Sequence, residues 1–234
     1  MKAADLILVI DMQKVYLPGN PWGCERMPEV IRKIQDLLHA LPQDNASLPT
    51  FTRETTNASA RAQILPETEI HQQVVFTEFL ADPHAVHGWA AYNEANEAIN
   101  ANPGMNALVD AFAPIVCRQH GSDGKKSCPD GDIRRFPIYT KASYSSLRAP
   151  ELRHLAETCV NAGGRVVLTG VVAECCVLAT FCDAVDLGFP VIWLDDAIAG
   201  FNAETEAAAR LTVRGLAPVQ VRIMTVREYL RETS

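Results

Sequence analysis

The sequence has no long hydrophobic run and no excess of positive charge, and each absence excludes a class of protein. No apolar segment approaches the ~20 residues that a membrane-spanning helix needs. The chain has 21 Lys and Arg against 28 Asp and Glu, a formal net charge of −7. This charge argues against nucleic acid or an anionic membrane as a partner, because both require a basic face. We therefore expect a small-molecule substrate, no nucleic acid and no membrane as partner.

The N-terminal stretch also lacks the features of a secretory signal. MKAADLILVIDMQ has one lysine and a short apolar run that reaches Asp11 too soon, without a small-residue cleavage site. Seven cysteines are an odd number, and no short secreted framework surrounds them. This pattern favours a reducing compartment with free thiols, so we expect a cytoplasmic protein.

Strand-like and helix-like segments alternate along the 234 residues. Short, continuous apolar runs predict six buried strands, at 5–12, 72–78, 136–141, 165–171, 190–199 and 219–226. Apolar residues at helical spacing and glycine stop signals predict helices at 28–41, 106–113, 150–164 and 203–217, with another after the fourth strand. The alternation predicts an α/β fold: a doubly wound, mainly parallel six-stranded sheet with helices on both faces, a Rossmann-like three-layer arrangement.

Two segments do not follow this alternation. Residues 42–71 are polar and rich in Thr, Asn, Ser and Glu, so we interpret them as an inserted loop or arm within a single domain spanning 1–234. Residues 118–135 contain glycines, charges and a Pro-Asp-Gly turn signal, which predicts an exposed loop near the active edge of the sheet.

Folds of this kind carry their chemistry outside the carboxyl ends of the strands. Asp11 ends the first predicted strand, Lys141 ends the third, and the pair Cys175 and Cys176 follows the fourth. A thiol in the first turn of a helix lies where free N–H groups and the helix dipole favour a thiolate and can receive an oxyanion. Asp11 could take the thiol proton while Lys141 holds the charged pair together. Taken singly, each residue has a simpler explanation: Asp11 could cap the turn that follows the strand, and Lys141 could be a solvated loop lysine.

Other interpretations of the cysteines are open. A zinc site needs converging ligands, and the sequence has no Cys-x-x-Cys spacing and no histidine near the cysteine pair. His84 and His87 could share a helix face, but two histidines alone do not define a metal site. A vicinal disulfide is disfavoured by the reducing compartment. Cys175 and Cys182 are more simply explained as small buried hydrophobic residues.

Three segments resemble the isochorismatase-like cysteine hydrolases, the superfamily of N-carbamoylsarcosine amidase and nicotinamidase. LILVIDMQKVYLPG resembles the family's opening strand, with its V-[IV]-D-x-Q core at Asp11 and Gln13. YTKASYSSL resembles the K-x-x-Y-S segment that carries Lys141. Residues 168–200 resemble the signature T-G-V-x-x-x-x-C-V-x-x-T-x-x-D-A-x-x-x-G, whose cysteine aligns with Cys176 and not with its neighbour.

This resemblance implies a catalytic triad of Asp11, Lys141 and Cys176 that works without a cofactor. It also implies a non-proline cis peptide bond between Val171 and Val172, with the N–H groups of Val172 and Cys176 forming an oxyanion hole. Cys176 would attack a carbonyl carbon, ammonia or an amine would leave, and water would hydrolyse the thioester. Because the family generally forms dimers or tetramers, we expect a homodimer or a homotetramer.

One departure from the family concerns metal. Nicotinamidases of this family carry an Asp-x-His metal motif after the second strand, where this sequence has Glu78, Phe79 and Leu80. The resemblance therefore implies a metal-free subgroup, similar to the N-carbamoylsarcosine, biuret, ureidoacrylate and maleamate amidohydrolases. Such an enzyme would cleave a C–N bond of a small amide, carbamoyl or ureido compound.

The substrate pocket is less well defined. The candidates are Phe79, Trp89, Tyr144 and Gln13, with Trp22 as a further one. The aromatic residues among them are equally well explained as core or interface. Two alternative functions stay open: an isochorismatase-type vinyl ether hydrolase in which Asp11 protonates the substrate, and a catalytically silent member that acts as a binding subunit.

Overall fold

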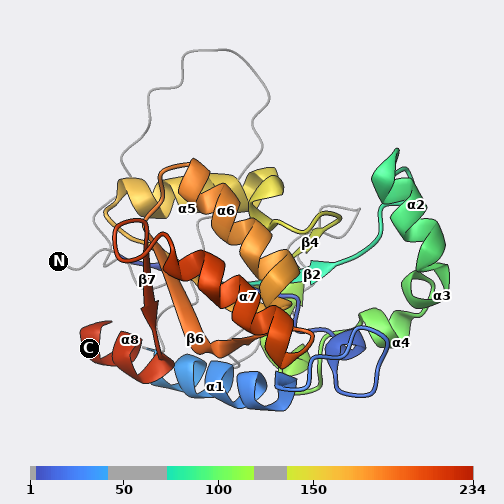
Figure 1. The fold of residues 1–234 in the computed structure, drawn as a ribbon, viewed down its shortest axis with the longest axis horizontal. Helices are drawn as coiled ribbons and strands as arrows, with labels where there is room; N and C mark the ends of the chain where they lie inside the picture. Colours follow the sequence, from blue (N-terminus) through green and yellow to red (C-terminus); the bar gives the residue numbers. More distant parts are fainter. Residues whose placement is uncertain (1–3, 42–72, 119–135, 234) are drawn as a thin grey trace, which may run out of the picture.

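The computed structural model describes residues 4–41, 73–118 and 136–233, and these build a seven-stranded parallel sheet (Figure 1). The strands lie in the order β3-β4-β2-β1-β5-β6-β7, and all six pairings between neighbours are parallel. Their bounds are β1 Leu6–Ile10, β2 Gln73–Phe79, β3 Val116–Arg118, β4 Phe136–Lys141, β5 Val166–Val171, β6 Val191–Ala199 and β7 Val221–Met224.

Helices cover both faces of this sheet. Helices α1 and α8 lie on one face, and α5, α6 and α7 lie on the other (Figure 1). The bounds are α1 Met27–Ala40, α2 Gly88–Ala95, α3 Glu97–Asn100, α4 Pro103–Asn106, α5 Pro150–Asn161, α6 Leu178–Asp186, α7 Ala203–Arg214 and α8 Val226–Thr233. Short helical turns complete the described chain: η1 Lys14–Tyr16, η2 Ala113–Ile115, η3 Ser146–Arg148 and the π-helical turn η4 Ala173–Val177.

The burial of strand β1 on both faces explains its unbroken run of apolar residues. Side chains alternate between the two faces of a strand, and both faces of β1 are covered. Ile7 and Val9 join the cluster under α1, whereas Leu6, Leu8 and Ile10 join the cluster under α5, α6 and α7. All five are fully buried, so β1 has no solvent-facing side that would call for a polar residue.

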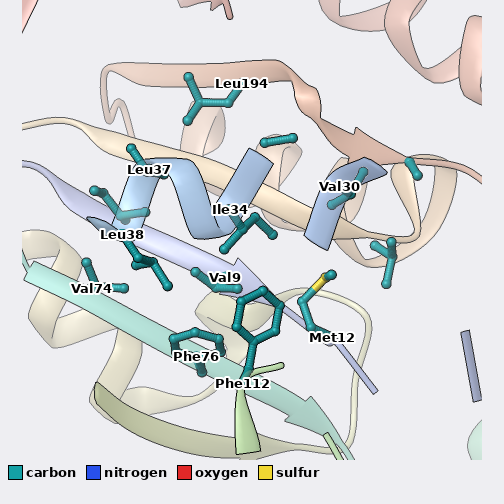
Figure 2. Packing of buried hydrophobic residues seen from close by; sticks show 14 of the residues in the cluster. Val9, Met12, Val30, Ile34, Leu37, Leu38, Val74, Phe76, Phe112 and Leu194 are labelled. Carbon is teal, nitrogen blue, oxygen red and sulfur yellow. The ribbon is translucent and has the colours of Figure 1, made fainter. Parts of the chain in front are cut away.

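Helix α1 supplies much of the first cluster. Val30, Ile34, Leu37 and Leu38 recur at helical spacing and form one buried face. Figure 2 shows this face above Val9 and the neighbouring residues of β2. At about 1.5–3 kcal/mol for each fully buried large apolar side chain, this packing fixes the end of β1 from which the site is built.

The fold prediction is confirmed as a doubly wound parallel α/β sheet, with two local errors. The sheet has seven strands rather than six, because β3 has three residues and is too short for periodicity to reveal. The predicted helix at 106–113 is wrong, because its backbone pairs with the segment after β1. Leu108 forms a bridge with Gln13, and Val109 N–H donates to Met12 O.

Two further expectations concern the cysteines and the insert. Cys117 is disulfide-bonded, so the expectation of free thiols is wrong for this residue. Cys24, Cys159 and the three cysteines at 175, 176 and 182 are free. The predicted arm at 42–71 lies outside the described residues. Within the described ranges, no helix is long and apolar enough to cross a membrane.

Candidate active site

Asp11 immediately follows β1 in a left-handed conformation, with φ 51°. Few residues other than glycine adopt this region readily, and Asp is one of them. Its N–H lies 3.2 Å from Thr77 O, and Thr77 Oγ1 donates back to Asp11 Oδ1 at 2.7 Å. The side chain is fully buried. The end of β2 therefore holds the carboxylate in a single orientation.

Lys141 ends β4, which is not adjacent to β1 because β2 lies between them. Two strand spacings amount to about 10 Å, so only a long side chain can bridge this gap. Lys141 Nζ lies 5.5 Å from the centre of the Phe79 ring at the end of β2. It donates to Asp11 Oδ2 at 2.6 Å, to Ser143 O at 3.0 Å and to Cys176 Sγ at 3.5 Å. All three ammonium hydrogens therefore have partners.

Cys176 lies in η4, directly beyond β5. Gly170 precedes this turn with φ +105°, and a Cβ there would collide with the backbone of Ile10, so only glycine allows β1 and β5 to approach this closely. The Val171–Val172 peptide bond is cis. The N–H groups of the two neighbours of Cys176 both bind Val172 O, at 3.1 and 3.2 Å. This turn carries the Cys176 thiol to the side chains of Asp11 and Lys141.

The nucleophile turn is also tied to the loop that follows Lys141. Thr180 Oγ1 donates to Cys176 O at 2.7 Å and accepts from Ser146 N–H at 2.9 Å. Thr180 and Ser146 are both fully buried. This link connects η4 with η3, so the segments that carry the thiol and the ammonium are held in register.

Burial raises the pKa of the Cys176 thiol, and the charge of Asp11 adds to this effect. Lys141 opposes the rise without reversing it. For Lys141 itself, burial lowers the pKa, but the charge of Asp11 and the contacts of the ammonium with Asp11 and Cys176 outweigh burial and raise it. The site therefore holds a protonated thiol beside an ammonium–carboxylate pair. The expectation of a stabilised thiolate at a helix start is wrong for this resting state, because desolvation dominates.

The twin cysteines face different parts of the molecule. Cys176 packs into the cluster under α5, α6 and α7, whereas Cys175 is half-buried against the cluster on the α1 side. Cys175 therefore packs against apolar neighbours, as expected. Cys182 is exposed, so its expected role as a small buried residue is wrong.

Six aromatic side chains adjoin the triad, and we name them the aromatic cluster. They are Tyr16, Trp22, Phe79, Trp89, Tyr92 and Tyr144. Ring centroids of neighbours lie 5.0–6.3 Å apart, mostly tilted or edge-to-face, as aromatic pairs prefer. The cluster includes the predicted aromatic residues of the pocket.

Sequence reasoning missed Tyr16 and Tyr92. Tyr16 follows Asp11 by five residues, at the same edge of the sheet. Tyr92 stands three residues after Trp89 in α2, a spacing that places both on one side of a helix. These two sequence positions are the signals that could have placed Tyr16 and Tyr92 in the aromatic cluster.

Unlike the aromatic residues of the expected pocket, Gln13 has a side chain that is hydrogen-bonded to backbone groups. Its Nε2 donates to Phe79 O at 3.0 Å and to Asn106 O at 2.8 Å, and its Oε1 accepts from Phe79 N–H at 2.8 Å. Both amide hydrogens are therefore used by backbone groups. Gln13 fixes the end of β2, and through it the Phe79 ring, rather than offering a donor to a substrate.

The described residues do not form a metal centre. They contain no group of three or more His, Cys, Asp or Glu side chains that could hold an ion. His84 and His87 are exposed. Glu78, at the position where a metal motif would begin, accepts from Thr140 Oγ1 at 2.8 Å. These side chains do not fit a bound metal ion.

Comparisons with known proteins agree with this fold. The family model described as "Isochorismatase domain" matches residues 5–228. A search of curated proteins found no significant match. An isochorismatase-like hydrolase from Alkaliphilus metalliredigens is similar in structure, with a TM-score of 0.60 and 19% identity over 99% of this chain and 100% of the other.

Two other solved structures are similar at the same level. A cysteine hydrolase from Pseudomonas syringae pv. phaseolicola 1448A has a TM-score of 0.64 and 18% identity, over 97% of this chain and 91% of the other. A pyrazinamidase from Pyrococcus horikoshii, solved in complex with zinc, has a TM-score of 0.58 and 18% identity, over 94% and 98%. At such identities the likeness shows the fold alone.

Proposed function

Because this chain belongs to the isochorismatase family, we propose that it is a metal-independent cysteine hydrolase that cleaves a C–N bond of a small amide, carbamoyl or ureido compound. One observation carries the proposal: Lys141 Nζ donates both to Asp11 Oδ2 and to Cys176 Sγ, at 2.6 and 3.5 Å. A nucleophile, a proton acceptor and a cation thus meet in a buried site at the carboxyl edge of the sheet.

The reaction begins with a neutral thiol. When the substrate carbonyl approaches, the Cys176 proton passes to Asp11 and Sγ forms a bond with the carbonyl carbon. Lys141 stabilises the negative charge that develops on sulfur and remains protonated throughout. Asp11 then donates its proton to the amide nitrogen, the C–N bond breaks, and ammonia or an amine leaves a thioester on Cys176.

The second half of the reaction uses the same groups. Asp11 takes a proton from water, the resulting hydroxide oxygen attacks the thioester carbon, and the C–S bond breaks. The thiolate of Cys176 then recovers the proton from Asp11, and the acid product leaves. One carboxylate therefore acts alternately as base and acid, while Thr77 and Lys141 hold it in place.

The oxyanion of each tetrahedral intermediate needs donors. We assign this role to the N–H groups of Val172 and Cys176, at the cis bond and in the nucleophile turn. Donors fixed before the reaction stabilise developing charge without reorganisation, and removing one from such a hole costs about 10²–10³ in rate. Phe79, Trp89 and Tyr144 form the apolar wall of the proposed substrate pocket.

The test is ammonia release from a panel of small amides, ureas and ureides. We expect activity in the wild-type protein and in Cys175→Ala, and none in Cys176→Ala. Mass spectrometry of quenched reactions would show the acyl adduct on Cys176. A panel without turnover, together with no labelling of Cys176 by any electrophile, would instead favour a silent binding subunit.

The same variant separates amide hydrolysis from vinyl ether cleavage. The vinyl ether reaction requires a proton from Asp11 and no sulfur nucleophile, so Cys176→Ala would spare it. Isochorismate turnover that survives this substitution, with no amide hydrolysis in the wild-type protein, would replace our proposal with that reaction.

A further inference from the structure

Residues 81–106, which we name the arm, stand apart from the rest of the fold. The arm contains α2, α3 and α4, and none of its residues is buried. In Figure 1, α2 and α3 lie to one side, clear of the helices that cover the sheet. Two apolar side chains of the arm, Ile99 and Met105, pack partly against the cluster under α1. An element with so little buried apolar surface opens locally at low free energy.

Hydrogen bonds attach the arm to the body of the fold at its two ends. Before it, Leu80 N–H donates to the carbonyl that ends β4. At its other end, Asn106 O accepts from Gln13 Nε2, and Ala107 O accepts from the N–H that begins η1. Between these ends, no hydrogen bond or ion pair joins the arm to any other part of the described chain. The arm can therefore be displaced without breaking such a bond.

Asparagine side chains hold the arm together internally. Asn93 of α2 donates through Nδ2 to Asp82 O, in the loop after β2, at 3.0 Å. Asn100 of α3 donates in the same way to Asn93 O at 3.3 Å, and Asn106 of α4 donates to Asn100 O at 2.9 Å. The loop and the three helices are thus linked in series, so we expect the arm to move as one body.

Aromatic rings of α2 bring the arm against the catalytic edge of the sheet. The centroids of the Trp89 and Tyr92 rings lie 6.1 and 6.2 Å from that of Phe79. The Trp89 ring also lies 5.0 Å from that of Tyr144. The Phe79 ring is in turn 5.5 Å from Lys141 Nζ. The rings of α2 therefore lie over the end of β2, beside the triad.

The triad itself is shielded from solvent. Cys176 is 3% exposed, Lys141 is 4% exposed and Asp11 is fully buried. A carbonyl carbon must come within about 3–3.5 Å of the sulfur before it can be attacked. Part of the cover must therefore move before any substrate can reach Cys176.

We propose that the arm is a lid, which swings about its two ends to admit the substrate and then closes Trp89 and Tyr92 over it. Closures of this kind separate a reaction from bulk water. The part of the lid in turnover rests on the proposed function. Its opening does not, because Cys176 becomes accessible whether or not a substrate is present.

The test is alkylation of the wild-type protein at pH 9 by iodoacetamide and by the bulkier iodoacetanilide, which carries the same reactive group. Peptide mapping follows three cysteines. Cys182 is exposed and gives the ratio of the two rates at an open thiol. Cys159 is 4% exposed in the cluster under α5 and reports global unfolding. We expect Cys176 to react at least about tenfold faster than Cys159, with the same ratio between reagents as Cys182.

Trp89→Ala should favour the open lid, because it removes the ring contacts with Phe79 and Tyr144. We expect alkylation of Cys176 to become several-fold faster, by the same factor for both reagents, while Cys159 is unchanged. The matched control is Val86→Ala, which shortens a side chain of the arm that is 64% exposed. It should leave both rates at Cys176 as in wild type.

Three results would overturn the lid. The first is alkylation of Cys176 as slow as that of Cys159, and the second is exclusion of iodoacetanilide alone, because either would mean a fixed cover. The third is a rate at Cys176 that falls as the protein concentration rises, which would assign the arm to a subunit interface. The expected alkylation in a protein that hydrolyses no amide would overturn the proposed function alone.

Discussion

Strand β1 has a buried aspartate beyond each end, and the two differ in what surrounds them. Asp5, at the amino end, accepts from Arg165 N–H, Nε and Nη2 and from the Tyr229 hydroxyl, at 2.7–3.0 Å. Asp11, at the carboxyl end, accepts from Thr77 and Lys141. Both carboxylates are buried and face a cation, but only the second cation also donates to a thiol.

The difference shows how one kind of ion pair can serve either stability or chemistry. Arginine is permanently charged and binds a carboxylate through a rigid, planar guanidinium group. Asp5 and Arg165 are therefore held in one fixed geometry. A lysine ammonium is a compact charge with three separate donors. At the other end this lets Lys141 bind Asp11 and still reach Cys176, where a proton can move between carboxylate and sulfur.

The largest effect is expected from Asp11→Asn. An amide cannot accept and return the thiol proton, so kcat/KM for amide hydrolysis should fall about 10³-fold or more. Ammonia release measures the rate, and circular dichroism shows that the variant is folded. A variant that keeps a tenth of wild-type activity would contradict the role of Asp11 as the proton acceptor.

Asp5→Asn should lower stability and leave activity unchanged, the opposite of Asp11→Asn. It removes one of the two carboxylates that bind the Arg165 guanidinium, Glu232 being the other. The loss of these charge-assisted hydrogen bonds should lower the free energy of unfolding by about 1.5–3 kcal/mol. Activity per folded molecule should match wild type, because Asp5 lies at the other end of the strand. Urea denaturation and active-site titration measure the two quantities, and a loss of specific activity without a loss of stability would reverse the comparison.

A smaller effect is expected from Thr180→Val. Valine keeps the shape but removes the hydroxyl that joins Cys176 O to Ser146 N–H. We expect a loss of about 1–2 kcal/mol in stability and a several-fold lower kcat, with KM little changed. Thr180→Ser should restore both. If serine fails to restore kcat, the hydroxyl does not position the nucleophile turn.

The smallest effect concerns Glu232, which binds Arg165 near the amino end of β1. Hydrogen bonds from Arg222 and Arg165 lower the pKa of Glu232 to about 2. A depressed carboxyl pKa stabilises the fold above the unfolded value of about 4.3, and this contribution is lost as the pH falls towards 2. Glu232→Gln should therefore cost less than about 1 kcal/mol at pH 7, and the difference should shrink at pH 3. Equal costs in urea unfolding at both pH values would contradict this.

The sequence was sufficient to bring Asp11, Lys141 and Cys176 together, because the strand-end rule requires only that the strands be recognised. It could not predict that Lys141 must reach across β2, since strand order depends on tertiary pairing. The direction of the Cys176 pKa was predicted wrongly for a similar reason. Helix position is visible in a sequence, but the extent of burial is set by segments far away along the chain.

The same limit applies to contacts without a sequence period. The pairing of Asp5 with Arg165 and Tyr229 joins residues more than 150 positions apart. Tyr16 and Tyr92 join the aromatic cluster from separate elements. Strand β3 was missed because three residues do not establish an alternation. Each of these features depends on the fold bringing together segments that are distant in the sequence.

The most direct test is the pH dependence of Cys176 alkylation by iodoacetamide, followed by peptide mapping in wild type and in Asp11→Asn. Burial and Asp11 raise the pKa of the thiol, so wild-type Cys176 should react slowly at pH 7 and faster as the pH rises above 9. Removing the negative charge of Asp11 lowers that pKa, so Asp11→Asn should be alkylated at lower pH although it no longer hydrolyses amides. Fast labelling of wild-type Cys176 at pH 7, with no shift to lower pH in Asp11→Asn, would contradict the claim that Asp11 controls the Cys176 proton.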